Sequence, residues 1–213
     1  GFVDHLSGCP NNALNYAGGC QAGQTYDITH NCIWLTRGFS AGTCASGRTA
    51  LLKFQCPSGP LTQVNSANNA GQYTGYMYYD YDPINDLIYA PSADFGGLSV
   101  YNCKTNTWKS VGYPPYTIGM ADASVPCCVD RKRGLWVATL FGAYGGNDAS
   151  TNVTNVWLYN GATGQWTVKT PVGPIPQFYQ AELAYDDVND KYVYFGGGCV
   201  PEVWAYDYTS NAW

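Results

Sequence analysis

The stretch from Phe178 to Trp213 decides the fold of this chain, and it reads FYQAELAYDDVNDKYVYFGGGCVPEVWAYDYTSNAW. Two alternating apolar runs, AELAYD and KYVYF, flank the polar turn DVND. Three glycines follow, then the run VWAYD, and the turn TSNA leads into Trp213. Short alternating runs bounded by Asp, Asn and Gly are typical of antiparallel strands. We therefore predict three strands and the start of a fourth.

The same layout recurs along the chain. In three copies a tryptophan stands seven positions after a tyrosine: Tyr101–Trp108, Tyr159–Trp166 and Tyr206–Trp213. A more divergent first copy has Phe54 and Leu61 at these two positions. The first residues of these four pairs, at positions 54, 101, 159 and 206, are 47, 58 and 47 residues apart. The turn aspartates at positions 82, 130 and 187 are 48 and 57 residues apart, which agrees with this period. Units of about 50 residues match the four-stranded blades of a propeller. The predicted fold class is all-β, with four propeller blades.

These repeats resemble the kelch family. DKYVYFGGG…VWAYDYTSNAW has the double glycine, the tyrosine and the tryptophan of a kelch repeat. The second copy, DLIYAPSADFGGLSVYNCKTNTW, and the third, GLWVATLFGAYGGNDASTNVTNVWLYNGATGQW, share these features, the third with an insertion. The first copy departs, with Gly38 and Gly42 instead of a pair and Leu61 instead of tryptophan. The resemblance implies a kelch-type β-propeller, a family that includes binding proteins and enzymes.

The repeats divide the chain into an N-terminal arm and four blades. The arm is 1–19, and the blades are predicted at 20–64, 75–111, 121–169 and 178–213. Four blades are the lower limit for a closed propeller, so we expect that this segment holds an incomplete ring. A small closed ring, or an open arc completed by a neighbouring subunit, are the alternatives.

The composition excludes several classes of partner. Charged residues make up 12% of the chain and the net charge is −5. The only basic cluster, Arg131 to Arg133, lies in a predicted hairpin turn, which argues against nucleic-acid binding. No apolar run approaches the roughly 20 residues of a membrane-spanning helix. The predicted partner is a protein or a glycan, including a second copy of the chain.

The chain has nine cysteines, and the first five are evenly spaced. Cys9, Cys20, Cys32, Cys44 and Cys56 follow one another at gaps of 11, 12, 12 and 12 residues. No Cys-x-x-Cys pair suggests zinc. The spacing favours disulfides formed in an oxidising, extracellular compartment, with buried free thiols as the alternative. The remaining candidates are Cys103, Cys127, Cys128 and Cys199, and an odd total leaves at least one cysteine unpaired within this segment.

Two further features concern the surface. Asn152-Val153-Thr154 is an N-glycosylation sequon within the blade-three insertion, so Asn152 is predicted to carry a glycan in a secreted eukaryotic protein. Aromatic residues gather in the loops predicted on one face of the propeller: Phe95, Tyr113, Tyr116, Tyr144, Phe178 and Tyr179. Such rings suit sugars or extended peptides, although packing between blades is the simpler interpretation.

An enzymatic function is the alternative. The kelch resemblance includes galactose-oxidase-like copper enzymes, which need two histidine ligands, but this chain has only His5 in the arm and His30 in a predicted turn. The turn from Asp80 to Asp86 lacks the acidic group, glycine and glutamate that an EF-hand calcium loop needs. We predict no catalytic residue, metal or cofactor within the segment. The two functions that stay open are a secreted interaction or structural assembly module, and an enzyme with its catalytic residues outside this segment.

Overall fold

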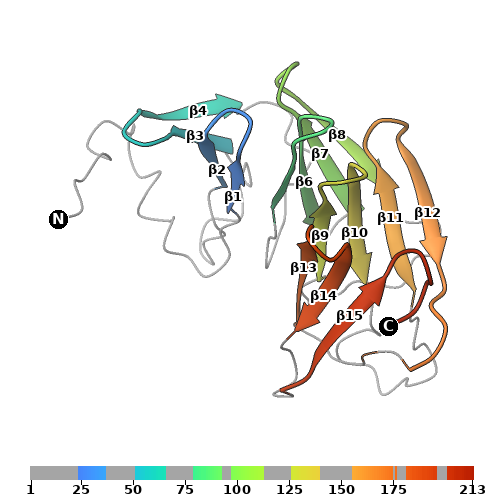
Figure 1. Cartoon of the computed structure of the whole chain (residues 1–213). Coiled ribbons are helices and arrows are strands. Elements are labelled where there is room, and N and C mark those ends of the chain that lie inside the picture. The colour runs from blue at the N-terminus through green and yellow to red at the C-terminus, as the bar shows by residue number, and fades with distance from the viewer. Residues whose placement is uncertain are drawn as a thin grey trace, which may run out of the picture.

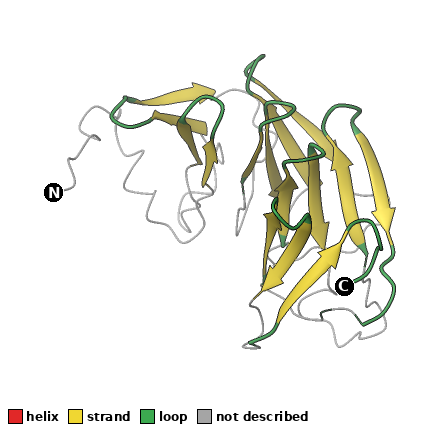
Figure 2. Ribbon diagram, in the orientation of Figure 1, coloured by secondary structure: helices red, strands yellow, loops and turns green. Residues whose placement is uncertain are grey.

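The structure, a computed structural model, describes residues 24–36, 51–65, 79–92, 97–112, 126–139, 155–174, 176, 181–195 and 201–213. All regular elements within these residues are β-strands (Figures 1 and 2). Accordingly, the described residues contain no helix with the length and apolarity needed to cross a membrane. The all-β prediction is confirmed.

The strands form four antiparallel sheets, each with its strands adjacent in chain order. Blade 1 consists of β1 (Gln24–Asp27), β2 (Cys32–Thr36), β3 (Leu51–Gln55) and β4 (Leu61–Asn65). Blade 2 consists of β5 (Asp80–Asp82), β6 (Leu87–Ser92), β7 (Gly97–Asn102) and β8 (Thr107–Gly112). Blade 3 consists of β9 (Cys127–Asp130), β10 (Leu135–Thr139), β11 (Val156–Asn160) and β12 (Gln165–Lys169). Blade 4 consists of β13 (Glu182–Asp186), β14 (Lys191–Phe195) and β15 (Val203–Asp207). The sheets are the blades of a four-bladed propeller.

The core of the molecule lies between the blades. The first strands of successive blades contact one another, β1 with β5, β5 with β9 and β9 with β13, so these strands are innermost. Three buried apolar clusters follow this order, one at each seam between successive blades. Blades 2 and 3 therefore each present one apolar face to the blade before and the other to the blade after.

The tyrosine–tryptophan pairs take the predicted places. Tyr101 and Trp108 are directly opposed on β7 and β8, as are Tyr159 and Trp166 on β11 and β12. Their ring centroids are 5.1 Å apart in both blades, and those of the blade-4 pair are 5.3 Å apart. Phe54 and Leu61 are opposed in the same way in blade 1. The seven-residue spacing thus indicates two side chains that face each other on adjacent strands joined by a tight hairpin.

One turn chemistry recurs in the hairpins. In each of six described turns the Asp or Asn that opens the turn accepts two backbone N–H groups with its side-chain Oδ1. The turn closes on a residue with positive φ, which is Gly134 or Gly164 in two turns. In the other four it is an asparagine or aspartate with φ between 54° and 58°: Asp86, Asn106, Asp190 and Asn211. Asn31, with φ 50°, closes the first turn of blade 1 in the same conformation. Asn, Asp and Gly tolerate this region best.

A tyrosine just before the turn donates a hydrogen bond to the side chain of the residue that closes the turn. The hydroxyl of Tyr206 donates to Asn211 over 2.6 Å, and Tyr81 and Tyr185 donate in the same way to Asp86 and Asp190. Tyr26 and Tyr101 repeat the contact with Asn31 and Asn106. The repeat thus couples an aromatic residue of the sheet to the side chain of the residue that closes its turn.

Gly161 is required by the close packing of blades 2 and 3. A Cβ at this position would lie 2.2 Å from the hydroxyl oxygen of Tyr89 and 2.7 Å from a methyl carbon of Leu87. Tyr89 is fully buried and bonded to Asp82, so it cannot move aside. We expect Gly161→Ala to lower the free energy of unfolding by about 1–3 kcal/mol through overpacking, measured by denaturant titration. A loss no greater than that of an exposed Thr105→Ala control would contradict this.

Some predictions lie outside the described residues. These include the arm 1–19 and the starting residues of the predicted blades 20–64, 75–111, 121–169 and 178–213. The blade boundaries therefore stay predictions.

Candidate functional site

The predicted loop-face residues are not placed by the structure. Phe95, Tyr113, Tyr116, Tyr144, Phe178 and Tyr179 all lie outside the described residues, as does Asn152. Two other regions have features that suggest function: the polar contacts at the seams between blades, and the outer face of blade 4.

A polar contact set recurs where the first turns of successive blades meet. Each turn opens on an aspartate: Asp27, Asp82, Asp130 or Asp186. Three positions later stands a bridging residue: His30, Asn85, Arg133 or Asn189. In blades 1 to 3 the bridging residue contacts its own opening aspartate and also reaches the residue that closes the first turn of the next blade.

Arg133 is the bridging residue between blades 3 and 4. Its guanidinium donates to buried Asp130 over 2.7 Å and to both carboxylate oxygens of Asp190 over 2.7 Å each. Tyr192 of blade 4 adds a hydroxyl bond of 2.6 Å to Asp130. Hydrogen bonds from Arg133 and Lys132 hold the pKa of Asp190 well below its usual range. The stability that this shift supplies is present at neutral pH and lost as the pH falls through the folded-state pKa.

Asn85 is the bridging residue between blades 2 and 3. Its Nδ2 donates to Asp82 over 2.6 Å and to the backbone carbonyl of Gly134 over 3.2 Å. A second bond crosses the same seam, because Asp80 accepts the backbone N–H of Val129 over 2.6 Å. Burial raises the pKa of Asp80. Neutral donors make the hydrogen bonds across this seam, and the Arg131 guanidinium of blade 3 lies 3.9 Å from the Asp80 carboxylate of blade 2.

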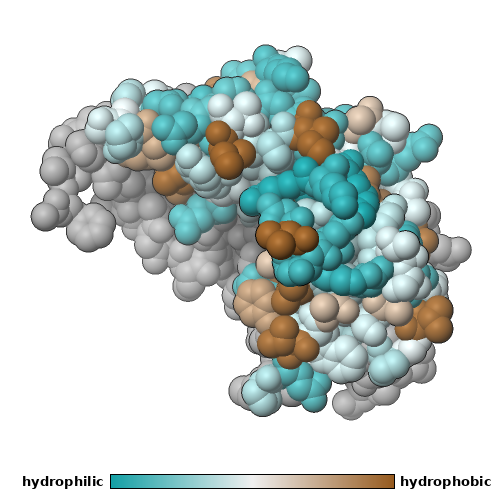
Figure 3. Space-filling model, viewed as in Figure 1, coloured by the Kyte–Doolittle hydropathy of each residue, from teal (hydrophilic) through white to brown (hydrophobic). Residues whose placement is uncertain are grey.

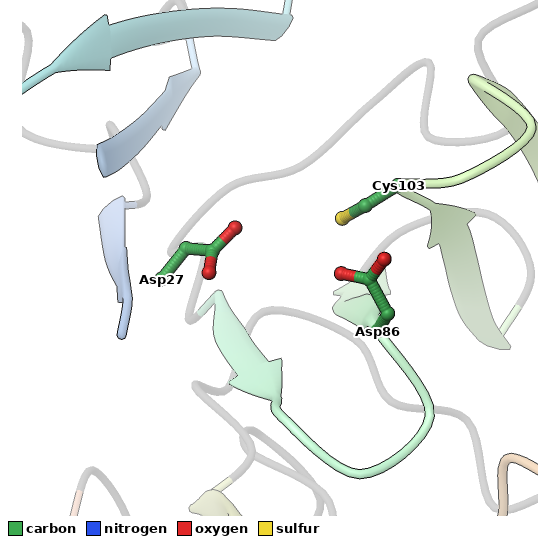
Figure 4. A group of neighbouring side chains, drawn as sticks. All are labelled: Asp27, Asp86 and Cys103. Atoms are coloured by element: carbon green, nitrogen blue, oxygen red, sulfur yellow. The ribbon is translucent and has the colours of Figure 1, made fainter. Parts of the chain in front are cut away.

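The seam between blades 1 and 2 brings two carboxylates and a thiol together. Single ligand-type atoms of Asp27, Asp86 and Cys103 all lie within 4.8 Å of one another, and their side chains point into a common space (Figure 4). His30 Nδ1 lies 2.8 Å from Asp27 Oδ2 and 3.7 Å from Asp86 Oδ1. These four side chains, Asp27, His30, Asp86 and Cys103, are called the seam cluster below.

Neighbouring groups orient the seam cluster. Asp27 is fully buried and accepts the indole N–H of Trp34 over 3.1 Å, while Asp86 accepts the hydroxyl of Tyr81 over 2.9 Å. Burial raises the pKa of Asp27, but hydrogen bonds from the backbone N–H of His30 and from Trp34 outweigh it, so that the pKa is lowered. Burial and the charge of Asp86 raise the pKa of the Cys103 thiol.

The disulfide prediction needs correction for the described cysteines. Cys32, Cys56, Cys103, Cys127 and Cys128 are free thiols. Cys127 and Cys128 cannot pair with each other, because adjacent residues on β9 point to opposite faces, Cys127 into the blade 2–3 cluster and Cys128 into the blade 3–4 cluster. Cys32 instead donates to Asp27 over 3.6 Å. The remaining candidates, Cys9, Cys20, Cys44 and Cys199, lie outside the described residues.

The outer face of blade 4 has no neighbouring blade among the described residues, and it carries both apolar and charged side chains. The charged ones are Glu182, Asp186, Lys191 and Asp207, with Lys191 and Asp207 forming an ion pair. In blade 3 the corresponding positions are buried against blade 4; they are Cys128, Leu135, Val137, Val156 and Leu158. In blade 4 they are Ala184, Lys191, Val193, Val203 and Ala205. Val203 is 69% exposed, and Phe195, its cross-strand partner, is 41% exposed. We call Ala184, Val193, Phe195, Val203 and Ala205 the blade-4 flank.

Apolar patches also occur elsewhere on the surface. Figure 3 shows separate brown patches on a largely hydrophilic face. Ile28, Ile84 and Val188 are exposed in the first turns of blades 1, 2 and 4. They are single residues in turns, whereas the blade-4 flank is a continuous sheet face.

The comparisons with known proteins agree with the fold. No protein-family model and no curated protein sequence matches the chain. A solved structure of a nidogen/laminin complex aligns with 81% of this chain and 55% of the other, at 10% identity and a TM-score of 0.53. A Bacteroides thetaiotaomicron protein of unknown function aligns with 89% of this chain and 41% of the other, at 9% identity and a TM-score of 0.55. The chain thus spans about half the length of these structures, and the likeness concerns the β-propeller fold alone.

Proposed function

We propose that the chain is an extracellular interaction module of the kelch type, and that its partner packs a β-sheet against the blade-4 flank. The observation that carries this proposal is the exposure of positions that are core residues in blade 3. Exposed apolar side chains grouped on one sheet face are typical of a surface that a partner protein covers. A second copy of the chain fits this description, because its own blade 4 presents the same exposed sheet face.

Other findings support the parts of this proposal. The tyrosine–tryptophan pairs in three blades support the kelch type. One of the aligned propeller structures is that of a nidogen/laminin complex, which is a protein–protein complex. Secretion is supported by the sequon at Asn152 and by the four cysteines outside the described residues. A glycan partner on the predicted loop face is the alternative ligand.

Self-association is the direct test of this function. We expect the native full-length protein to sediment as an oligomer at micromolar concentration, because an exposed sheet face favours association. A double variant, Phe195→Ser with Val203→Ser, should shift it to monomer while its circular dichroism stays unchanged. Val188→Ser is the matched control, since Val188 is 87% exposed in the same blade but lies in the first turn. The control should sediment like the parent protein.

Two outcomes would contradict the proposal. One is a native protein that remains monomeric at high concentration and binds no glycan on an array. The other is association that the double variant leaves unchanged. Closure of the flank by further blades of the same polypeptide would give the first outcome.

A further inference from the structure

The seam between blades 1 and 2 differs from the other seams in how its charge is balanced. Between blades 3 and 4, the aspartate pair Asp130 and Asp190 has the guanidinium of Arg133 between its members. Between blades 2 and 3, Gly134 replaces the second carboxylate. Between blades 1 and 2, Asp27 and Asp86 form the equivalent carboxylate pair, but His30 replaces the arginine and Cys103 adds a thiol.

We propose that the seam cluster binds one divalent metal ion of the zinc class, with Asp27, Asp86, Cys103 and His30 as its ligands. The ion would occupy the role that the Arg133 guanidinium has at the blade 3–4 seam, between an opening aspartate and the closing aspartate of the next blade. It would join blade 1 to blade 2.

The donor set selects the class of metal. Carboxylate oxygens alone suit calcium or magnesium, but a thiolate and an imidazole favour zinc and related transition metals. Zinc takes four ligands at about 2.0–2.3 Å, so three ligand atoms within 4.8 Å of one another need only small side-chain rotations to reach one ion. His30 lies outside this group of three, and its Nδ1 is hydrogen-bonded to Asp27 over 2.8 Å; it becomes the fourth ligand when metal binding replaces that hydrogen bond.

The supporting contacts resemble those of other metal sites. Trp34 and Tyr81 donate to Asp27 and Asp86, and such outer hydrogen bonds hold carboxylate ligands in orientation. The Cys103 thiol must lose its proton to bind, and the proton passes to solvent as the sulfur–metal bond forms. His30 is 41% exposed, which leaves the ion a route in from solvent.

Cobalt(II) provides a direct test, because a cobalt–thiolate bond gives a charge-transfer band in the near ultraviolet. The full chain is treated with a chelator, kept reduced and titrated with cobalt(II), then with zinc. We expect one cobalt per chain, the charge-transfer band, and displacement of cobalt by zinc. Zinc should also raise the unfolding temperature, whereas the same concentration of magnesium should not.

Variants assign the ligands. Cys103→Ser should abolish the charge-transfer band, and Asp86→Asn should weaken cobalt binding by about tenfold or more. Cys127→Ser is the matched control, since Cys127 is a free thiol in a different core cluster and should keep the band. Circular dichroism of each variant without metal shows whether it is folded. Asp86→Asn retains the side-chain shape at this turn and keeps the test valid if Cys103→Ser unfolds.

Three results would overturn the proposal. The first is a folded parent protein that binds no cobalt or zinc. The second is a charge-transfer band that survives Cys103→Ser. The third is a Cys32–Cys103 disulfide, found by mass spectrometry of alkylated native protein, because it would consume the thiolate. None of these results depends on whether the blade-4 flank binds a partner.

Discussion

Replacing Asp130 by alanine should lower the free energy of unfolding by about 3–5 kcal/mol, because it removes a fully buried carboxylate that accepts several hydrogen bonds at once. The Asp130 carboxylate accepts backbone N–H groups of its own turn, the guanidinium of Arg133 and the hydroxyl of Tyr192. The backbone N–H groups and the Tyr192 hydroxyl would lose this acceptor together, whereas Arg133 keeps its contacts with Asp190. Urea denaturation of the parent and variant proteins, followed by tryptophan fluorescence, measures the difference.

Asp186→Ala is the matched control for this prediction. Asp186 opens the equivalent turn of blade 4, and it accepts N–H groups of Val188 and Asn189, both of which belong to that same turn. We expect a loss of about 1 kcal/mol. Equal losses for the two variants would show that the seam contacts of Asp130 add nothing to its turn-capping role.

Tyr159→Ala should cost a similar amount, about 3–5 kcal/mol, because it removes a large buried ring. Tyr159 packs against Trp166 of its own blade, and its ring lies 6.1 Å from that of Tyr89 in blade 2. The cavity would open at the seam between the two blades. Thermal and urea unfolding both measure the loss.

The hydroxyl of Tyr159 should contribute little, and phenylalanine tests this. Gly164 closes the turn after Tyr159, so the turn offers no side-chain acceptor. Tyr159→Phe should therefore change stability by less than about 0.5 kcal/mol. Tyr206→Phe is the contrast: it loses the 2.6 Å bond to Asn211 and should cost about 0.5–1.5 kcal/mol. A larger loss for Tyr159→Phe than for Tyr206→Phe would contradict the proposed coupling of tyrosine to turn.

The seam contacts had a sequence signal that alignment of the turns would have revealed. His30, Asn85, Arg133 and Asn189 all stand three positions after the opening aspartate, and all carry a side-chain N–H donor. Taken one turn at a time, Arg131 to Arg133 resembles an ordinary charged hairpin, and the turn from Asp80 to Asp86 resembles a failed calcium loop. The equivalence of the positions becomes visible only when the turns are superimposed.

The sequence by itself determined the fold class, the repeat and the turn chemistry. These are local properties: a tyrosine and a tryptophan seven residues apart face each other because a tight hairpin joins their strands. Only the tertiary structure decided which groups meet between blades. Arg133 and Asp190 are 57 residues apart, and no local pattern records that contact. The same holds for Asp27 and Asp86, and for the exposure of the blade-4 flank, because burial depends on which sheet packs against which.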